Sequence, residues 1–154
     1  MNKKCIVFIV VLLLVVMAGA YKFIIQGSVS SGSDGRTTIH LSTDERDLVL
    51  KEMRAFLESV QQITKGISNN NMELVAEYAK KVGTATQNEV PGTLMGKLPI
   101  SFKKLGFDTH SKFDLLALDA ESLGDSSHSL RQLSELMENC VACHATHRFE
   151  IREK

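Results

Sequence analysis

Residues 42–68 read STDERDLVLKEMRAFLESVQQITKGIS, and this stretch determines which fold the chain can adopt. Ser42 and the acidic residues after it provide a helix start, because negative charge stabilises the positive end of the helix dipole. Apolar residues then recur at alternating intervals of four and three, which places them along one face of a helix. They are Val49, Met53, Phe56, Val60, Ile63 and Ile67. The stretch therefore predicts an amphipathic helix that must bury this face.

Three more amphipathic segments follow, over residues 71–82, from residue 108 or 109 to 123, and from residue 126 or 127 onward. Each repeats its apolar residues at helical spacing, and Gly83 and Gly124 end the first two. Residues 84–107 hold both prolines and predict a long connection, and no segment has a strand pattern. Because no helix can bury its apolar face alone, the sequence predicts an all-α fold, an antiparallel four-helix bundle.

The N-terminal segment predicts export. Residues 5–20 (CIVFIVVLLLVVMAGA) carry no charge, follow two lysines, and are extended by further apolar residues up to Ile25. Residues 1–25 thus predict a signal anchor that crosses the bacterial inner membrane as a helix, with the rest of the chain facing the periplasm. The alternative is a cleaved signal peptide and a soluble periplasmic protein, because Ala18, Gly19 and Ala20 suit a signal peptidase. The apolar stretch resumes after that site, which favours the anchor.

The rest of the chain divides into two parts. Residues 26–40 are rich in Gly, Ser and small polar residues, which predicts a flexible tether, and residues 41–154 form the predicted helical domain. The 18 basic residues are balanced by 18 acidic ones. This balance excludes the basic surface that a nucleic-acid-binding protein needs.

A short motif near the C-terminus carries the predicted chemistry. Residues 140–144 read CVACH, and C-x-x-C-H is the attachment sequence for c-type haem. On a helix, Cys140 and Cys143 share a face, so their sulfurs can form thioethers with two vinyl groups of one porphyrin. The imidazole of His144 projects near them and can bind the iron. The motif therefore predicts one covalent haem c.

Other uses of these residues stay open. A thioredoxin-like dithiol would need a strand before the helix, and the sequence shows no such strand. Zinc could bind Cys140, Cys143, His144 and His147, although four ligands on two helical turns would struggle to surround one ion tetrahedrally. A disulfide between the two cysteines would distort the helix.

A C-terminal C-x-x-C-H on the last helix of an exported bundle resembles the class II cytochromes c, the cytochrome c prime family, over residues 42–152. The resemblance implies a role near the haem for Arg148, four positions after the motif His, although His147 stands where the family commonly has an aromatic residue. It also implies that a first-helix residue meets the other face of the iron, and Met53 is the candidate. His110 on the third helix is the rival ligand, and an open site is the third possibility.

These features predict a periplasmic, membrane-anchored cytochrome that transfers one electron to or from a redox partner protein. An iron with no ligand from the first helix would instead bind or sense nitric oxide or carbon monoxide. A zinc-binding or purely structural bundle is a further alternative. The sequence shows no carboxylate pair, nucleophile elbow or phosphate loop, so we do not expect an enzyme. The family resemblance also implies a possible homodimer.

Overall fold

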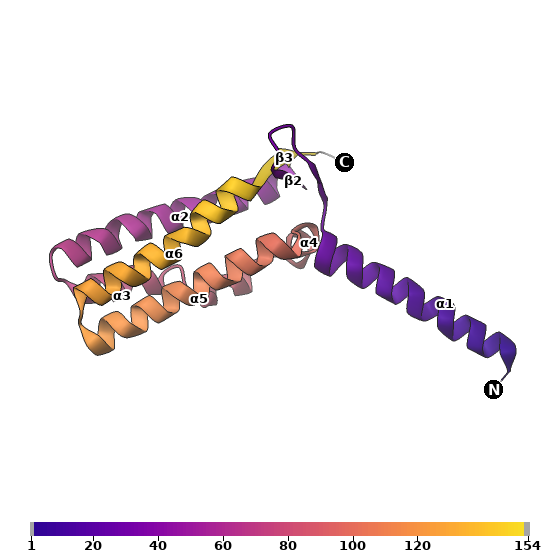
Figure 1. Ribbon diagram of the computed structural model, residues 1–154, viewed down its shortest axis with the longest axis horizontal. Coiled ribbons are helices and arrows are strands. Elements are labelled where there is room, and N and C mark those ends of the chain that lie inside the picture. Colours follow the sequence, from indigo (N-terminus) through magenta and orange to yellow (C-terminus); the bar gives the residue numbers. More distant parts are fainter. Residues whose placement is uncertain (1, 153–154) are drawn as a thin grey trace.

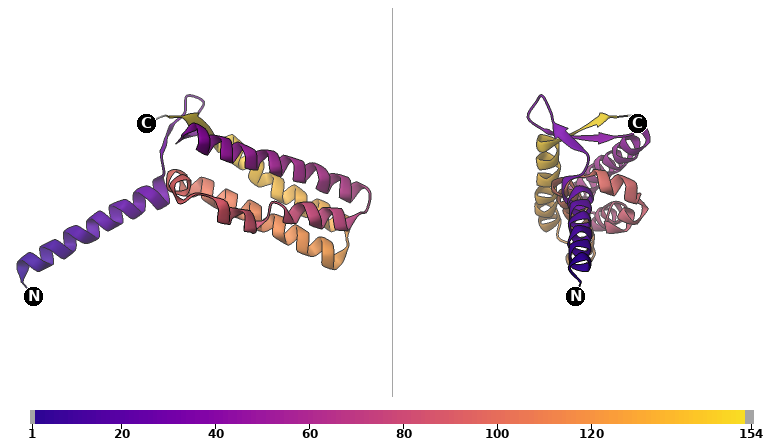
Figure 2. Two further views of the ribbon diagram at one scale, coloured as in Figure 1. Left: turned by 180° about the vertical axis from the view of Figure 1, so that it is seen from behind. Right: turned by 90° about the vertical axis from the view of Figure 1, so that its right-hand side faces the viewer.

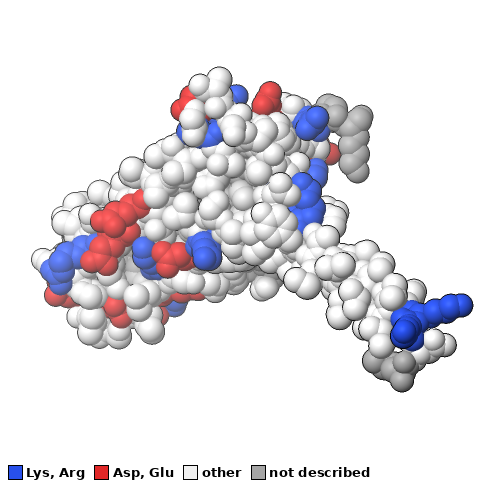
Figure 3. All heavy atoms as spheres, turned by 45° about the vertical axis from the view of Figure 1, so that its right-hand side comes forward, with Lys and Arg blue, Asp and Glu red and all other residues white. Residues whose placement is uncertain are grey.

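The computed structural model describes residues 2–152, apart from the side chain of Glu89, and these residues are mostly helical. Helix α1 (Lys3–Ala20) continues into the short π-helical segment η1 (Tyr21–Gln26). Together they project away from the other helices, and no residue of either is buried (Figure 1). Figure 3 shows this projection as an uncharged surface with positive charge at its tip. Residues 3–26 are long and apolar enough for a membrane anchor or a signal sequence.

All four predicted amphipathic segments are helices. They are α2 (Thr43–Ser68), α3 (Met72–Lys80), α5 (Ile100–Leu123) and α6 (Ser126–Thr146). Helix α2 contacts α3 and α6, and α5 contacts α3 and α6, so the helices lie side by side (Figures 1 and 2). Their apolar faces meet in one core cluster, which includes Phe56, Ile63, Val75, Phe113, Leu116 and Leu136.

The helix starts follow from the capping residues. Ser42 and Glu45 form a reciprocal capping box at the start of α2, each bonding the other's backbone N–H. Asn71 caps α3 and Asp125 caps α6, in both cases by accepting backbone N–H bonds. Gly124 ends α5 with a φ of 64°, a left-handed conformation that glycine adopts without strain.

The predicted start of the third helix was wrong. Helix α5 begins at Ile100, directly after Pro99, and not at residue 108 or 109. Proline lacks the N–H that a helix start leaves unpaired, so it begins a helix as readily as it breaks one. The connection before it is also structured, as the 3₁₀ segment η2 (Thr84–Glu89) and the short helix α4 (Gly92–Lys97).

The prediction of no strands was also wrong, as was the flexible tether over residues 26–40. A small sheet has the order β1 (Val29–Ser31), β2 (Thr37–Leu41) and β3 (His147–Ile151). Strand β2 pairs antiparallel with β1 and parallel with β3, so it joins the segment before α2 to the segment after α6. Ile39 and Leu41 are fully buried, which gives this short sheet its own apolar cluster.

Two helical glycines differ in the space around them, and this difference is testable. A Cβ at Gly66 in α2 would lie 2.8 Å from Val75 Cγ2 and 3.0 Å from the carbonyl oxygen of Asn71. A Cβ at Gly106 in α5 would meet no atom within 4 Å. We expect Gly66→Ala to lower the free energy of unfolding by about 1–3 kcal/mol through overpacking. Gly106→Ala should raise it by up to about 1 kcal/mol through helix propensity. Urea unfolding followed by circular dichroism measures both, and equal effects would contradict the predicted contact.

Candidate haem-attachment site

The C-x-x-C-H residues lie in the last two turns of α6. Cys140 and Cys143 are half-buried free thiols, and Cys140 packs against the main core cluster. His144 is exposed, and within residues 2–152 its imidazole has no hydrogen-bond partner. Two thiols thus lie close together at the edge of the core beside an unpaired imidazole.

The surroundings of the thiols are apolar. Burial raises the pKa of Cys140, and burial together with the neighbouring Cys140 raises the pKa of Cys143 to about 11. Both groups therefore stay protonated thiols near neutral pH. A redox dithiol needs a thiolate stabilised by positive charge or a helix N-terminus, whereas these cysteines lie near a helix C-terminus.

The helix ends earlier than its apolar spacing predicts. The zinc alternative placed His147 on the same helix as the motif, but α6 stops at Thr146 and His147 is the first residue of β3. Its buried imidazole bonds the hydroxyls of Ser101 and Thr146, and its ring packs edge-on against Phe102. Because α6 ends before it, His147 does not lie on the helical face that carries the motif. Its side chain instead contacts the first turn of α5.

Arg148 belongs to a charge cluster that the sequence analysis did not find. Its guanidinium lies 3.6 Å from the carboxylate of Asp34, which also forms an ion pair with Arg36. Arg36 donates a hydrogen bond to the backbone carbonyl of His144 over 3.3 Å. Hydrogen bonds from Arg36, opposed only by slight desolvation, lower the pKa of Asp34 to about 2. Asp34 and Arg36 come from the β1–β2 turn, which sequence analysis read as tether.

Met53 lies on α2 between the two apolar clusters. It is half-buried and packs against both the helical core and the cluster under the sheet. Cys140 packs against the same core, and α2 contacts α6. Five large apolar side chains on these two helices are exposed, and they include Leu57 at 71%, Met137 at 42% and Val141 at 69%.

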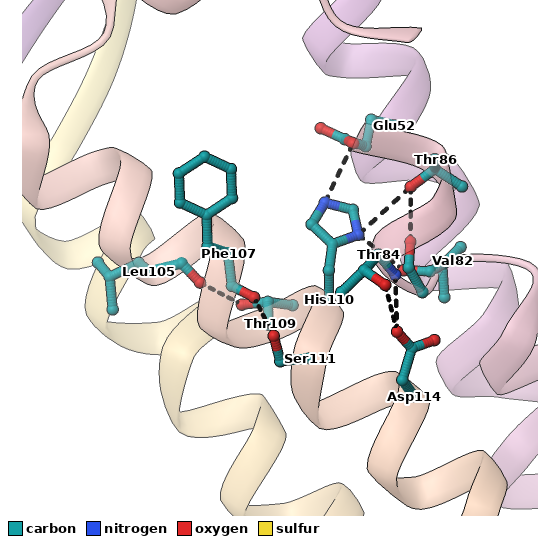
Figure 4. Close-up of polar contacts among 11 residues, drawn as sticks. Glu52, Val82, Thr84, Thr86, Leu105, Phe107, Thr109, His110, Ser111 and Asp114 are labelled. Carbon is teal, nitrogen blue, oxygen red and sulfur yellow. Dashed lines mark hydrogen bonds and ion pairs between the residues drawn. The ribbon is translucent and has the colours of Figure 1, made fainter. Parts of the chain in front are cut away.

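His110, the rival ligand, is buried in another place. Its Nδ1 donates to the carbonyl of Val82 over 2.8 Å, with Thr86 nearby at 3.4 Å, and its Nε2 lies 3.3 Å from Glu52 (Figure 4). Its ring also packs on Phe56. Both ring nitrogens therefore have protein partners, as expected for a satisfied core histidine.

This environment favours the charged form of His110. Burial lowers its pKa, but hydrogen bonds to Glu52 and to backbone carbonyls raise it by more, so the pKa lies above the usual 6.5. A raised pKa in the folded state stabilises the protein below pH 6.5, and this contribution is lost as the pH rises through the folded-state pKa.

We predict that Glu52→Gln lowers the pKa of His110, because the uncharged amide no longer stabilises the imidazolium. The ring C–H signals of His110, followed by NMR from pH 5 to 9, report this pKa directly. Glu58→Gln, also on α2, is the control and should leave it unchanged. The same titration midpoint in wild type and Glu52→Gln would contradict the pairing.

Comparisons with known proteins add no relative. No family model matches the chain, and neither the curated proteins nor the solved structures include a match. Within the described residues, no group of three or more His, Cys, Asp or Glu side chains is arranged to hold a metal ion. The four residues considered for zinc are therefore not brought together.

Proposed function

We propose that this chain is a membrane-anchored c-type cytochrome that carries one covalent haem and transfers single electrons. The observation that carries the proposal is the arrangement at the end of α6. Two free thiols lie half-buried on one turn, beside a histidine whose imidazole has no partner in the described chain. This is the donor set that covalent haem attachment requires.

The surrounding residues fit the group. A haem held there would supply a one-electron couple, with its potential set by the axial ligands and by burial. Cys140 and Cys143 would hold the porphyrin edge, and His144 would bind the iron. The exposed apolar side chains Leu57, Met137 and Val141 would gain an apolar surface to pack against.

The helices provide a scaffold of the proposed kind. Short connections join α2 to α3 and α5 to α6, and contacts run around the four helices from α2 to α3, α5, α6 and back to α2. These contacts support an antiparallel four-helix bundle as its architecture. On the basis of this helix arrangement and the C-x-x-C-H motif, we also propose that the chain is similar to the class II cytochromes c. The proposal includes a homodimer.

Met53 is the proposed sixth ligand. It comes from the helix that contacts α6 and packs against the same core as Cys140. His110 is the weaker candidate because Val82 and Glu52 already occupy both its ring nitrogens. If no side chain binds the sixth position, the same site would bind nitric oxide or carbon monoxide, which is the second candidate function.

The charge cluster beside the motif supports a role for Arg148. Its ion pair with Asp34 and the bond from Arg36 to His144 link the β1–β2 turn to the last turn of α6. We propose that this link fixes the backbone of His144, so that the imidazole keeps one orientation. The protein would face the periplasm from the inner membrane and exchange electrons with a partner protein there.

Covalent attachment has a direct test. Wild-type protein made in the periplasm with a c-type maturation system should keep its haem colour after acid–acetone extraction. Cys140→Ser/Cys143→Ser should lose all colour on extraction, because both thioether bonds are gone. His144→Ala should fail to give a normal six-coordinate spectrum.

The control for this test is Cys5→Ser, which removes the third cysteine and should keep the colour. Wild-type protein that never acquires covalent haem would overturn the proposed function. Bound zinc, measured by metal analysis, would then favour the metal-binding alternative.

The sixth ligand has a spectroscopic test. Met53→Ala should convert a low-spin spectrum into a high-spin one and let the reduced protein bind carbon monoxide promptly, because the iron loses its thioether. Met72→Ala removes another half-buried methionine and should leave the spectrum unchanged. Wild-type protein that is high-spin in both oxidation states would exclude Met53 and favour gas binding.

A further inference from the structure

An apolar pocket of about 240 Å³ lies between α2, η2, α4 and α5. Its walls include Phe56, Val82, Leu94, Leu98 and Phe102, and none of the described residues of α6 lines it. The C-x-x-C-H motif and Met53 are not part of it. Leu48 and Phe107 on its rim are exposed, so the pocket reaches the surface. The pocket is therefore distinct from the proposed haem site.

Polar groups gather at one part of this pocket. His110 and Glu52 line it as a bonded pair, and Thr86 lies beside them (Figure 4). Gln87 also lines the pocket, and its amide nitrogen is buried without a hydrogen-bond partner among the described residues. Burying an unpaired donor is costly, so this amide indicates a missing acceptor. The pocket thus combines a carboxylate, a neighbouring buried amide without a partner and apolar walls.

The pocket lies next to the end of the apolar N-terminal helix. Lys103, which lines it, donates hydrogen bonds to the carbonyls of Phe23 and Ile24, each over 3.1 Å. Helix α4, which supplies Leu94, contacts η1, and the ring of Phe23 lies beside Gly96. The pocket therefore lies near the point at which residues 3–26 would leave a membrane. A molecule dissolved in the bilayer could enter it from there.

We propose that the pocket binds the ring of a lipid-soluble quinone that enters from the membrane. This inference rests on the membrane anchor of the proposed function. An apolar cavity of about 150 Å³ already accommodates a benzene ring, so the volume suits one substituted ring. A ring carbonyl accepts from the amide of Gln87, and the hydroxyl of the reduced form donates to Glu52.

A fatty acid fits the same chemistry less well. Its chain would fill the apolar walls, but its carboxylate would meet the carboxylate of Glu52. Of the three lysines on the pocket, Lys81 pairs with Glu77 and Lys103 bonds the η1 carbonyls, whereas Lys51 has no partner among the described residues. A quinone head group is neutral, accepts hydrogen bonds through its carbonyls when oxidised and donates them through its hydroxyls when reduced. Such a group suits Gln87 and Glu52 better than a carboxylate does.

The pocket contains a residue that makes a sharp test possible. Gly106 lines the pocket in the middle of α5, and a Cβ there would meet no atom within 4 Å. Gly106→Leu therefore places a side chain on the pocket wall from a position where the Cβ itself has free space, and it increases helix propensity. Gly92→Leu is the matched control, because Gly92 has the same free space in α4 but does not line this pocket.

The experiment titrates full-length, haem-loaded protein in detergent with decylubiquinone and follows binding by calorimetry. We expect one site per chain in wild type, affinity about tenfold or more weaker in Gly106→Leu, and unchanged affinity in Gly92→Leu. Gln87→Leu should also weaken binding. Absence of binding in wild type, or equal affinity in both glycine variants, would overturn the proposal.

Two further readouts separate this inference from the proposed function. Lauric acid is titrated into the same protein, and an affinity equal to that of decylubiquinone would overturn the assignment to quinones. The absorption spectrum and the mass of each sample report the haem and the retained N-terminal helix. Failure of haem attachment or anchoring is thereby distinguished from failure of the pocket to bind a quinone.

Discussion

The parallel pairing of β2 with β3 holds together the end of the protein that carries the C-x-x-C-H motif. Residues 37–41 lead directly into α2, and residues 147–151 follow directly from α6, so the ladder joins the start of one helix to the end of the other. Ile39 and Leu41 anchor it by full burial. Helix α6 ends at Thr146, and the buried imidazole of His147, the first residue of β3, bonds the hydroxyl of Ser101 at the start of α5. The start of α2, the end of α6 and the start of α5 thus all contact one small sheet. These contacts restrain the last turn of α6.

Helix α2 contributes two neighbouring residues, Glu52 and Met53, one to each of the two proposed sites. Glu52 lines the apolar pocket, whereas Met53 packs between the two clusters and contributes nothing to that pocket. Successive residues on a helix point in directions about 100° apart, so Glu52 faces the pocket while Met53 packs against the two apolar clusters. A quinone beside Glu52 would therefore lie against a different face of α2 from the proposed iron ligand Met53. One rigid helix thus fixes the positions of both residues relative to each other.

The sequence predicted what local periodicity determines. The apolar faces of α2 and α3, the Ser42 start and the Gly124 end depend on residues close in the chain, and the structure confirms them. On α6 the expected apolar face was wrong in part, because Leu133 is buried but Leu130 and Met137 are exposed. The sheet could not be predicted in this way, because β2 and β3 are short and each needs a partner from the opposite end of the domain. Pro99 and Gly106 indicated a loop, yet proline caps α5 and the glycine lies inside it. The Asp34–Arg36–Arg148 cluster depends on the same long-range pairing.

The apolar pocket shows how an unpaired polar atom can be more informative than a paired one. Three side chains in residues 2–152 have a buried atom without a partner, namely His40, Gln87 and Gln132. His40 and Gln132 each make a hydrogen bond through another atom of the same side chain, whereas the side chain of Gln87 makes none within those residues. Leaving a buried donor unpaired costs about 1–3 kcal/mol, and an apolar residue there would avoid that cost. Packing alone therefore does not account for Gln87, and the proposed acceptor oxygen in the adjoining pocket would.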